Sequence, residues 1–242
     1  MIARKREAPA HVALARRLGV SIVTGERPPG SALPGEIDLA ESFGVARSVI
    51  REALRMLSGK GLVVSKPKSG TRIRERHEWN LLDPQLLGWM FEGAAPPLTF
   101  VRSLFQLRLI VEPAAAELAA RQRTPRQLSR LGYALEEMTS YGLDSEPGRA
   151  ADQQFHAIIL KATSNELLVS LSASISAAVR WTTLFKWRAG EPRDSLPEHQ
   201  RLFDAIARSD AAAARAATVG LIGQAALDTE QAIAKLGEAE VA

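Results

Sequence analysis

The first third of the chain opens with apolar residues at the spacing of a helix. Val12, Ala15, Leu18 and Ile22 share one face when the backbone is helical. The segment GERPPGSALPGE follows, and its Gly-Pro clusters interrupt helical backbone. The pattern predicts an amphipathic helix over about residues 8–25, followed by a turn-rich connection.

A second apolar pattern predicts two more helices and a hairpin. Leu39 and Phe43 mark a short helix that ends at Gly44, because glycine readily adopts the left-handed conformation that closes a helix. The next helix covers residues 46–57, and the runs LVVS and TRIR, separated by KPKSG, are typical of a two-stranded hairpin. Three helices and a two-stranded wing over residues 8–76 describe a winged helix-turn-helix.

The remainder of the chain lacks an alternating strand pattern and is predicted to be helical. Residues 77–97 form a linker with a short helix that begins after Asp83 and Pro84. Turn-forming segments then divide residues 98–238 into an all-α bundle. Its expected helices cover residues 98–122, 125–140, 147–163, 166–188, 197–208 and 211–236. The fold class is therefore mainly α, with six to seven helices in the second domain.

Composition and charge narrow the function classes. The 242 residues include no cysteine, which excludes disulfides and cysteine metal sites. The N-terminus lacks the apolar core of a signal peptide, and no run approaches the ~20 apolar residues of a membrane span, so we expect a soluble, cytoplasmic protein. Residues 1–78 hold 15 Lys+Arg against 8 Asp+Glu, whereas residues 79–242 hold 16 against 19. This imbalance indicates that the first third meets a polyanion.

The third helix has the features of a helix that reads DNA. Major-groove recognition needs hydrogen-bond donors in the first turns of a helix, and cations beside it that hold the phosphates. Arg47 and Arg51 share one face of this helix. The wing adds lysines, and a glycine that lets the backbone approach DNA closely. The candidate DNA-binding residues are Arg47, Ser48, Arg51, Arg55, Lys66, Lys68 and Gly70.

The helical domain holds a candidate metal site. Asp152 and His156 lie one helical turn apart, and His199 falls near the start of a later helix. Carboxylate and imidazole groups that converge inside a bundle can bind a divalent transition metal such as zinc, nickel or manganese. From spacing alone, an Asp–His pair is more often a hydrogen-bonded or solvated pair, so both interpretations stay open.

The first third resembles the GntR family of bacterial transcription regulators almost from end to end. The matching landmarks are Pro29–Gly30, Leu33–Pro34, Glu36, Leu39–Ala40, Gly44–Val45, Arg47, Val49, Arg51–Glu52–Ala53–Leu54, Leu57, Gly61 and Gly70. The resemblance implies that Arg47 and Arg51 contact bases and phosphates, and that Gly70 lies at the wing tip. Two positions depart from the family pattern. Ala46 stands where a helix-capping serine is common, and Ile37 where an arginine that contacts DNA is common.

The second domain resembles the all-helical effector domain, called FCD, of the FadR-like GntR subfamily. The resemblance rests on the segments RLIVEPAAAELAA, DQQFHAIILKATSNELL and EHQRLFDAIARSDAAAARAA. In metal-binding members, the ligands are an Asp, a His four residues later, a His in a later helix and a third His in the last helix. The first three ligands map onto Asp152, His156 and His199, and the fourth falls on Leu221, which cannot ligate. The resemblance implies a weaker site open to water or an effector carboxylate, and the alternative is a metal-free polar pocket.

Two arginines are candidate effector ligands. Arg108 matches an arginine that faces the effector cavity in many relatives, where a guanidinium can bind a carboxylate through two hydrogen bonds. Its alternative role is an ion pair with Glu112, one turn later. Arg180 is a second candidate. The segments WNLLDP and LLGW resemble the galactonate-type branch of the family, which regulates sugar-acid use, so a hydroxylated carboxylate is the expected effector.

These observations predict a homodimeric, sequence-specific repressor and not an enzyme. Two recognition helices would straddle successive major grooves of a pseudo-palindromic operator, and a small carboxylate would shift their spacing by binding one state better. One alternative is a metal-dependent enzyme that uses the Asp/His cluster, although no nucleophile motif or phosphate loop accompanies it. The other is an architectural protein with a uniform, salt-dependent affinity for all DNA.

Overall fold

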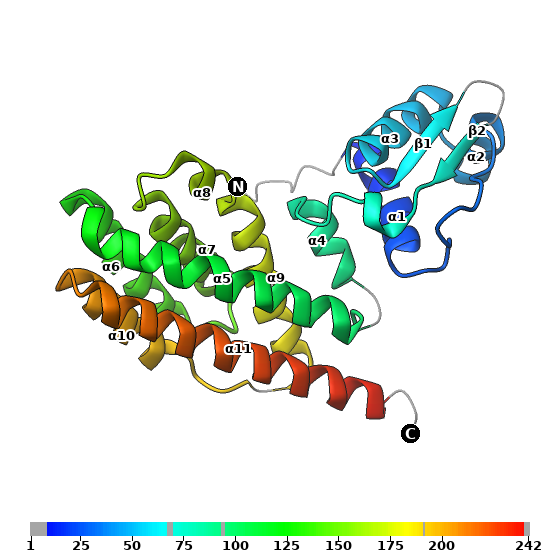
Figure 1. Ribbon diagram of the computed structural model, residues 1–242. Helices are drawn as coiled ribbons and strands as arrows, with labels where there is room; N and C mark the ends of the chain where they lie inside the picture. The colour runs from blue at the N-terminus through cyan, green and yellow to red at the C-terminus, as the bar shows by residue number, and fades with distance from the viewer. Residues whose placement is uncertain (1–8, 67–69, 93–94, 191, 240–242) are drawn as a thin grey trace, which may run out of the picture. The chain divides into compact units, whose positions relative to one another are not determined.

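The computed structural model describes residues 9–66, 70–92, 95–190 and 192–239, and the chain divides between residues 94 and 95 into two compact units. The first unit contains helices and one hairpin (Figure 1). Its elements are α1 (Ala10–Val23), α2 (Glu36–Phe43), α3 (Arg47–Gly59), β1 (Val63–Lys66), β2 (Gly70–Ile73), the 3-10 turn η1 (Arg76–Glu78) and α4 (Pro84–Met90). The predicted winged helix-turn-helix is confirmed.

The three helices of the winged helix-turn-helix pack around a small apolar core. Leu18 and Ile22 on α1, Leu39 on α2, and Ile50 and Leu57 on α3 are at most 1% exposed. The helix α3 packs against both α1 and α2. Full burial of each such side chain contributes about 1.5–3 kcal/mol, so the core fixes the polar face of α3 toward solvent.

The turn between α2 and α3 sets where the reading helix begins. Gly44 has a φ of 62°, a left-handed conformation that ends α2 and that a side chain would strain. Ala46 is the N-cap of α3, and no side chain caps this end. The missing serine cap noted in the sequence corresponds to a cost of about 1 kcal/mol.

The wing is anchored along both edges of β2. The strands β1 and β2 pair as an antiparallel hairpin, with Val63 opposite Ile73. Residues 30–33 run along the other edge of β2, where the N–H of Leu33 donates to the carbonyl of Thr71 at 2.9 Å. The connection that precedes α2 therefore holds the wing in place, a contact that the hairpin pattern alone did not predict.

The helix α4 packs within the first unit, where the sequence suggested a linker. Asp83 caps it by accepting backbone N–H groups of its first turn. The same carboxylate forms an ion pair with Lys60 at the end of α3, with 2.8 Å between Oδ1 and Nζ. Trp89 lies so close to Gly19 of α1 that a Cβ on residue 19 would collide with the indole ring. These contacts make α4 part of the DNA-reading unit.

The second unit is all-α, as predicted, and consists of seven helices within residues 95–190 and 192–239 (Figure 1). They are α5 (Leu98–Gln122), α6 (Pro125–Tyr141), α7 (Glu146–Lys161), α8 (Glu166–Ser170), α9 (Ser172–Arg188), α10 (Leu196–Ala207) and α11 (Ala211–Ala239). The single helix expected over 166–188 is wrong, because Leu171 separates α8 from α9. Its ψ of −9° departs from the helical value of about −42°, and its N–H bonds to Leu168, only three residues back.

The bundle is organised around α7, which packs against α5, α6 and α9, while α11 lies along α5 (Figure 1). Small buried residues on α5 (Ala115, Ala116, Ala119 and Ala120) let its neighbours approach closely. The inner faces of α5, α7, α9, α10 and α11 meet around one polar cavity. The helices within residues 9–66, 70–92, 95–190 and 192–239 include none with the length and apolar character of a membrane span.

Candidate functional site

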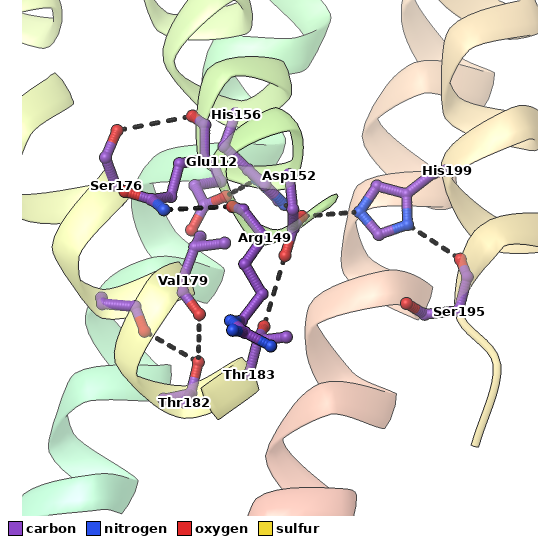
Figure 2. Close-up of polar contacts among 12 residues, drawn as sticks. Glu112, Arg149, Asp152, His156, Ser176, Val179, Thr182, Thr183, Ser195 and His199 are labelled. Carbon is purple, nitrogen blue, oxygen red and sulfur yellow. Dashed lines mark hydrogen bonds and ion pairs between the residues drawn. The ribbon is translucent and has the colours of Figure 1, made fainter. Parts of the chain in front are cut away.

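The polar cavity of the bundle contains the Asp/His cluster predicted from the sequence. Asp152 and His156 point from successive turns of α7, and His199 approaches from α10 (Figure 2). Their exposed fractions are 3%, 4% and 3%. Three ionisable side chains buried to this degree need partners or a bound ion, because unpaired charge is expensive in the interior.

The distances within the cluster fit a shared metal ion. Oδ1 of Asp152 lies 3.2 Å from Nε2 of His199 and 3.6 Å from Nε2 of His156. One ligand atom from each of the three residues falls within 4.8 Å of the others. Two atoms that each lie about 2.1 Å from one tetrahedral zinc ion are about 3.4 Å apart. The observed distances of 3.2 and 3.6 Å are therefore close to those between two ligand atoms of one metal ion.

Hydrogen bonds to the other ring nitrogens set both histidines for metal binding. Nδ1 of His156 lies 2.6 Å from Oε2 of Glu112, and Nδ1 of His199 lies 2.8 Å from the carbonyl of Ser195. Both oxygens only accept, so each Nδ1 carries a hydrogen and donates it. In each neutral imidazole, Nε2 then carries no hydrogen, and its lone pair faces Asp152. Metal-binding histidines are oriented by partners of this kind.

Two atoms at the centre of the cluster lack a hydrogen-bond partner. They are Oδ1 of Asp152 and Nε2 of His199. Thr183 donates to the other carboxylate oxygen of Asp152, at 3.3 Å. Burying an unsatisfied polar atom costs about 1–3 kcal/mol, and a divalent cation between the two atoms would remove that cost. The residues present therefore fit a transition metal.

Leu221 occupies the remaining side of the cavity. It is 4% exposed, lies on α11, and lines the same space as Asp152 and His199. The position that the family comparison assigned to a fourth ligand thus faces the cluster but offers only methyl groups. The cavity here measures about 30 Å³, room for water molecules or the end of a ligand.

The two candidate effector arginines lie in different surroundings. Arg108 is 3% exposed, lines the cavity and donates from Nε to Oε1 of Glu112 at 2.6 Å. It therefore forms the ion pair with Glu112 and also faces the cavity, while its contact with an effector stays a prediction. Arg180 pairs with Glu146 at 2.8 Å, with its side chain 38% exposed, and it is not among the described residues that line the cavity beside Asp152.

The candidate DNA-binding residues of α3 are all exposed. Arg47, Ser48, Arg51 and Arg55 lie on the side of the helix opposite its buried residues. Nε of Arg51 donates to Glu36 on α2 at 2.8 Å, and Arg47 lies 3.9 Å from the same carboxylate oxygen. This carboxylate holds both guanidinium groups near the start of the recognition helix.

The wing presents a backbone suited to close approach. Lys66 is exposed at the end of β1, and Gly70, which opens β2, has a φ of 72°. A residue with a side chain is strained in this left-handed conformation, so glycine is favoured there. Lys68 lies outside the described residues.

The sequence does not predict several contacts of the site. It indicates Glu112 only as a partner of Arg108, whereas in the structure Glu112 also orients His156. Ser195 contributes through its backbone carbonyl, which sequence cannot reveal, and Thr183 and Lys186 come from α9. Helical periodicity places Thr183 and Lys186 on one face of α9, but which face meets the cluster depends on packing.

Acid should destabilise the metal-free protein more steeply than surface carboxyls can explain. Burial raises the pKa of Glu112, but the charges of Arg108 and His156 outweigh it and lower the pKa from 4.5 to about 2. Burial likewise raises the pKa of Asp152, but contact with His199 and the histidine charges lower it from 3.8 to about 2. Both carboxyls therefore ionise more readily in the folded protein than in the unfolded chain.

The sign of the effect follows from proton binding. As the pH falls from about 5 to 2, the carboxyls of the unfolded chain take up protons before those of the folded protein. The free energy of unfolding therefore decreases over this pH range, and the stabilisation by the two carboxylates is fully present above about pH 5. The shifts correspond to roughly 3 kcal/mol for Glu112 and roughly 2 kcal/mol for Asp152. Urea unfolding at several pH values, in the presence of a chelator, measures the free energy of unfolding. Its decrease toward low pH should be less steep in Glu112→Gln than in the wild type. An equally steep decline in that variant would contradict the assignment.

Known proteins resemble both halves of the chain. Residues 11–73 match the bacterial regulatory proteins of the gntR family, and residues 103–224 match the FCD domain. The galactonate operon transcriptional repressor of Escherichia coli K12 is 36% identical over 207 residues, which cover 85% of this chain and 90% of that protein. The HTH-type transcriptional regulator LutR of Bacillus subtilis 168 is 36% identical over 203 residues, which cover 81% and 90%.

A solved structure agrees at the level of the fold. The one described as "Lar controls the expression of the Listeria monocytogenes agr system and mediates virulence" aligns with a TM-score of 0.66 at 19% identity, over 94% of this chain and 99% of that chain. The relatives are transcriptional regulators, and both domains are matched in order. The chain therefore belongs to the GntR family of bacterial transcriptional regulators, in the FadR-like subfamily with an FCD effector domain.

Proposed function

We propose that this regulator is a cytoplasmic, homodimeric repressor that leaves its operator when a small hydroxylated carboxylate binds beside a metal held by Asp152, His156 and His199. The observation that carries the proposal is the convergence of Asp152 Oδ1 and His199 Nε2, both buried without a hydrogen-bond partner. Zinc, nickel and manganese are the candidate metals, since imidazole and carboxylate ligands suit all three.

DNA binding falls to the exposed face of α3 and to the wing. Arg47 and Arg51 project from the first turns of α3, where guanidinium groups can contact guanine edges or phosphates. Ser48 and Arg55 extend this face, and Lys66 and Gly70 bring the wing to the backbone. One such module makes few contacts, so two copies on a pseudo-palindromic operator multiply the affinity.

Effector binding falls to the open side of the metal cluster. A bound divalent metal would supply a Lewis-acidic position for carboxylate and hydroxyl oxygens. Arg108 adds a positive charge at the same cavity and, through Glu112, orients His156. Leu221 leaves one side of the cluster without a protein ligand, so that position is available to the effector.

The relatives support a sugar acid as the effector. The Escherichia coli relative is named a galactonate operon transcriptional repressor, and it is 36% identical to this chain over 207 residues. A sugar acid carries a carboxylate and neighbouring hydroxyl groups, which together can chelate a metal and meet a guanidinium. We therefore propose a hydroxylated carboxylate of this class.

Fluorescence anisotropy with a labelled operator tests the proposal. The operator is selected from randomised DNA by the metal-loaded protein, and competitor DNA of random sequence measures specificity. We expect D-galactonate or a related sugar acid to weaken operator binding at least about tenfold, a change of about 1.4 kcal/mol. An operator affinity that no hydroxylated carboxylate changes would contradict effector control.

A further inference from the structure

Lys186 is a half-buried cation that takes no part in the contacts among Asp152, His156 and His199. It lies on α9, and its side chain lines the cavity of the Asp/His cluster. No hydrogen bond or ion pair joins its ammonium group to another residue of the described chain. Burial lowers the pKa of Lys186, because the charged form loses water, while Asp228 and Asp152 act in the opposite direction. A ligand oxygen placed against this group would supply the partner it lacks.

The same residue lies where two cavities join. The cavity at the cluster measures about 30 Å³, and a larger one beside it measures about 230 Å³. The residues that line both are Thr183, Lys186, Arg193 and Ser195. The larger cavity continues between α9 and the start of α10, with Leu143, Trp187 and Leu196 among its walls.

The volumes limit what the cluster cavity can hold alone. About 30 Å³ accommodates water molecules or the end of a ligand, whereas sites for whole small molecules occupy about 300–1,000 Å³. The two cavities together approach the lower end of that range. A ligand with one end at the cluster must therefore extend past Lys186 into the larger cavity, unless it is very short.

We propose that both cavities form one site for an elongated hydroxy acid, and that Lys186 binds oxygen atoms along its chain, beyond the carboxylate that meets the cluster. This inference rests on the proposed function and adds a length requirement to it. Arg193, which shares the junction, already pairs with Glu198 at 2.8 Å, so Lys186 is the cation free to serve the ligand. The amphipathic walls suit a carbon chain that carries hydroxyl groups.

Isothermal titration calorimetry on the metal-loaded full chain tests the length requirement. The probes are D-galactonate, whose six-carbon chain can extend from the cluster past Lys186 into the larger cavity, and glycolate, whose two carbons confine it to the cluster cavity. We expect the wild type to bind D-galactonate at least about tenfold more tightly than glycolate. Lys186→Met should remove that difference by weakening D-galactonate binding about tenfold, with glycolate affinity and metal content unchanged.

Two further variants serve as controls for the role of the Lys186 ammonium group. Lys186→Arg keeps the positive charge and should retain most of the affinity for D-galactonate, which a merely structural role would not predict. Lys161→Met removes an exposed lysine at the end of α7 and should bind both acids as the wild type does.

Three results would overturn the inference. They are equal binding of both acids by the wild type, undiminished binding of D-galactonate by Lys186→Met, and equal loss of both acids in that variant. In each of these cases carboxylate control of the cluster still stands. If the wild type bound neither acid, the proposed function would fail as well.

Discussion

Replacing Asp152 by asparagine will remove the metal and leave the helical bundle folded. Oδ1 of Asp152 is the atom common to both short distances, 3.2 Å to His199 and 3.6 Å to His156. An amide supplies no negative charge, so metal affinity should fall at least ~100-fold, beyond the loss typical of altered supporting groups. The shape of the side chain is kept, and Thr183 can still donate to its oxygen.

Elemental analysis of protein purified without chelator measures this effect. We expect near-stoichiometric metal in the wild type and background levels in Asp152→Asn. Added metal should raise the melting temperature of the wild type only, since binding at 100 times Kd stabilises by about 2.7 kcal/mol. Asp204→Asn is the matched control, because Asp204 lies on α10 and bonds only to Gln200 among the described side chains. Full metal content in Asp152→Asn would show that the cluster is not the site.

Arg47→Ala and Arg51→Ala will each weaken operator binding and leave dimerisation intact. Both guanidinium groups are more than half exposed, at 56% and 65%, and neither belongs to the apolar core. A lost base contact costs about 1–3 kcal/mol of binding free energy. A lost phosphate contact lowers the slope of the logarithm of affinity against the logarithm of salt concentration by about one. The two kinds of contact can therefore be told apart by titration at several salt concentrations.

The control for this pair is a cation outside the first unit. Arg121 on α5 has a side chain 60% exposed and pairs with Glu117. Arg121→Ala removes the same charge from the chain but leaves the recognition helix complete, so we expect its operator affinity to equal that of the wild type. Operator affinity equal to that of the wild type in either Arg47→Ala or Arg51→Ala would show that α3 is not docked as proposed.

Local patterns predicted most of the fold. Apolar periodicity located α1 and α3, and Gly44 marked the turn between α2 and α3 because a left-handed residue is required there. The division of 166–188 at Leu171 left no trace in composition, since no glycine or proline stands at the break. The docking of α4 was also missed, because it depends on Lys60 and Gly19, which are distant in the chain.

Less of the site than of the fold could be predicted from the sequence. Helical spacing brings Asp152 and His156 onto one face, but only packing brings His199 to within 3.2 Å of Asp152. The groups that orient the imidazoles, Glu112 and the carbonyl of Ser195, come from other segments. Their roles depend on three-dimensional contacts, and one of them involves no side chain at all.

The most direct test compares operator affinity in metal-loaded and chelator-treated protein, each with and without D-galactonate. In the proposed function the effector binds at the metal of the cluster in the second unit and the DNA binds the first unit, so removing the metal should abolish the coupling between them. We predict that D-galactonate raises the operator Kd at least about tenfold in the metal-loaded protein and has no effect after the metal is removed. An operator Kd that responds to D-galactonate equally in both forms, or in neither, would contradict the account.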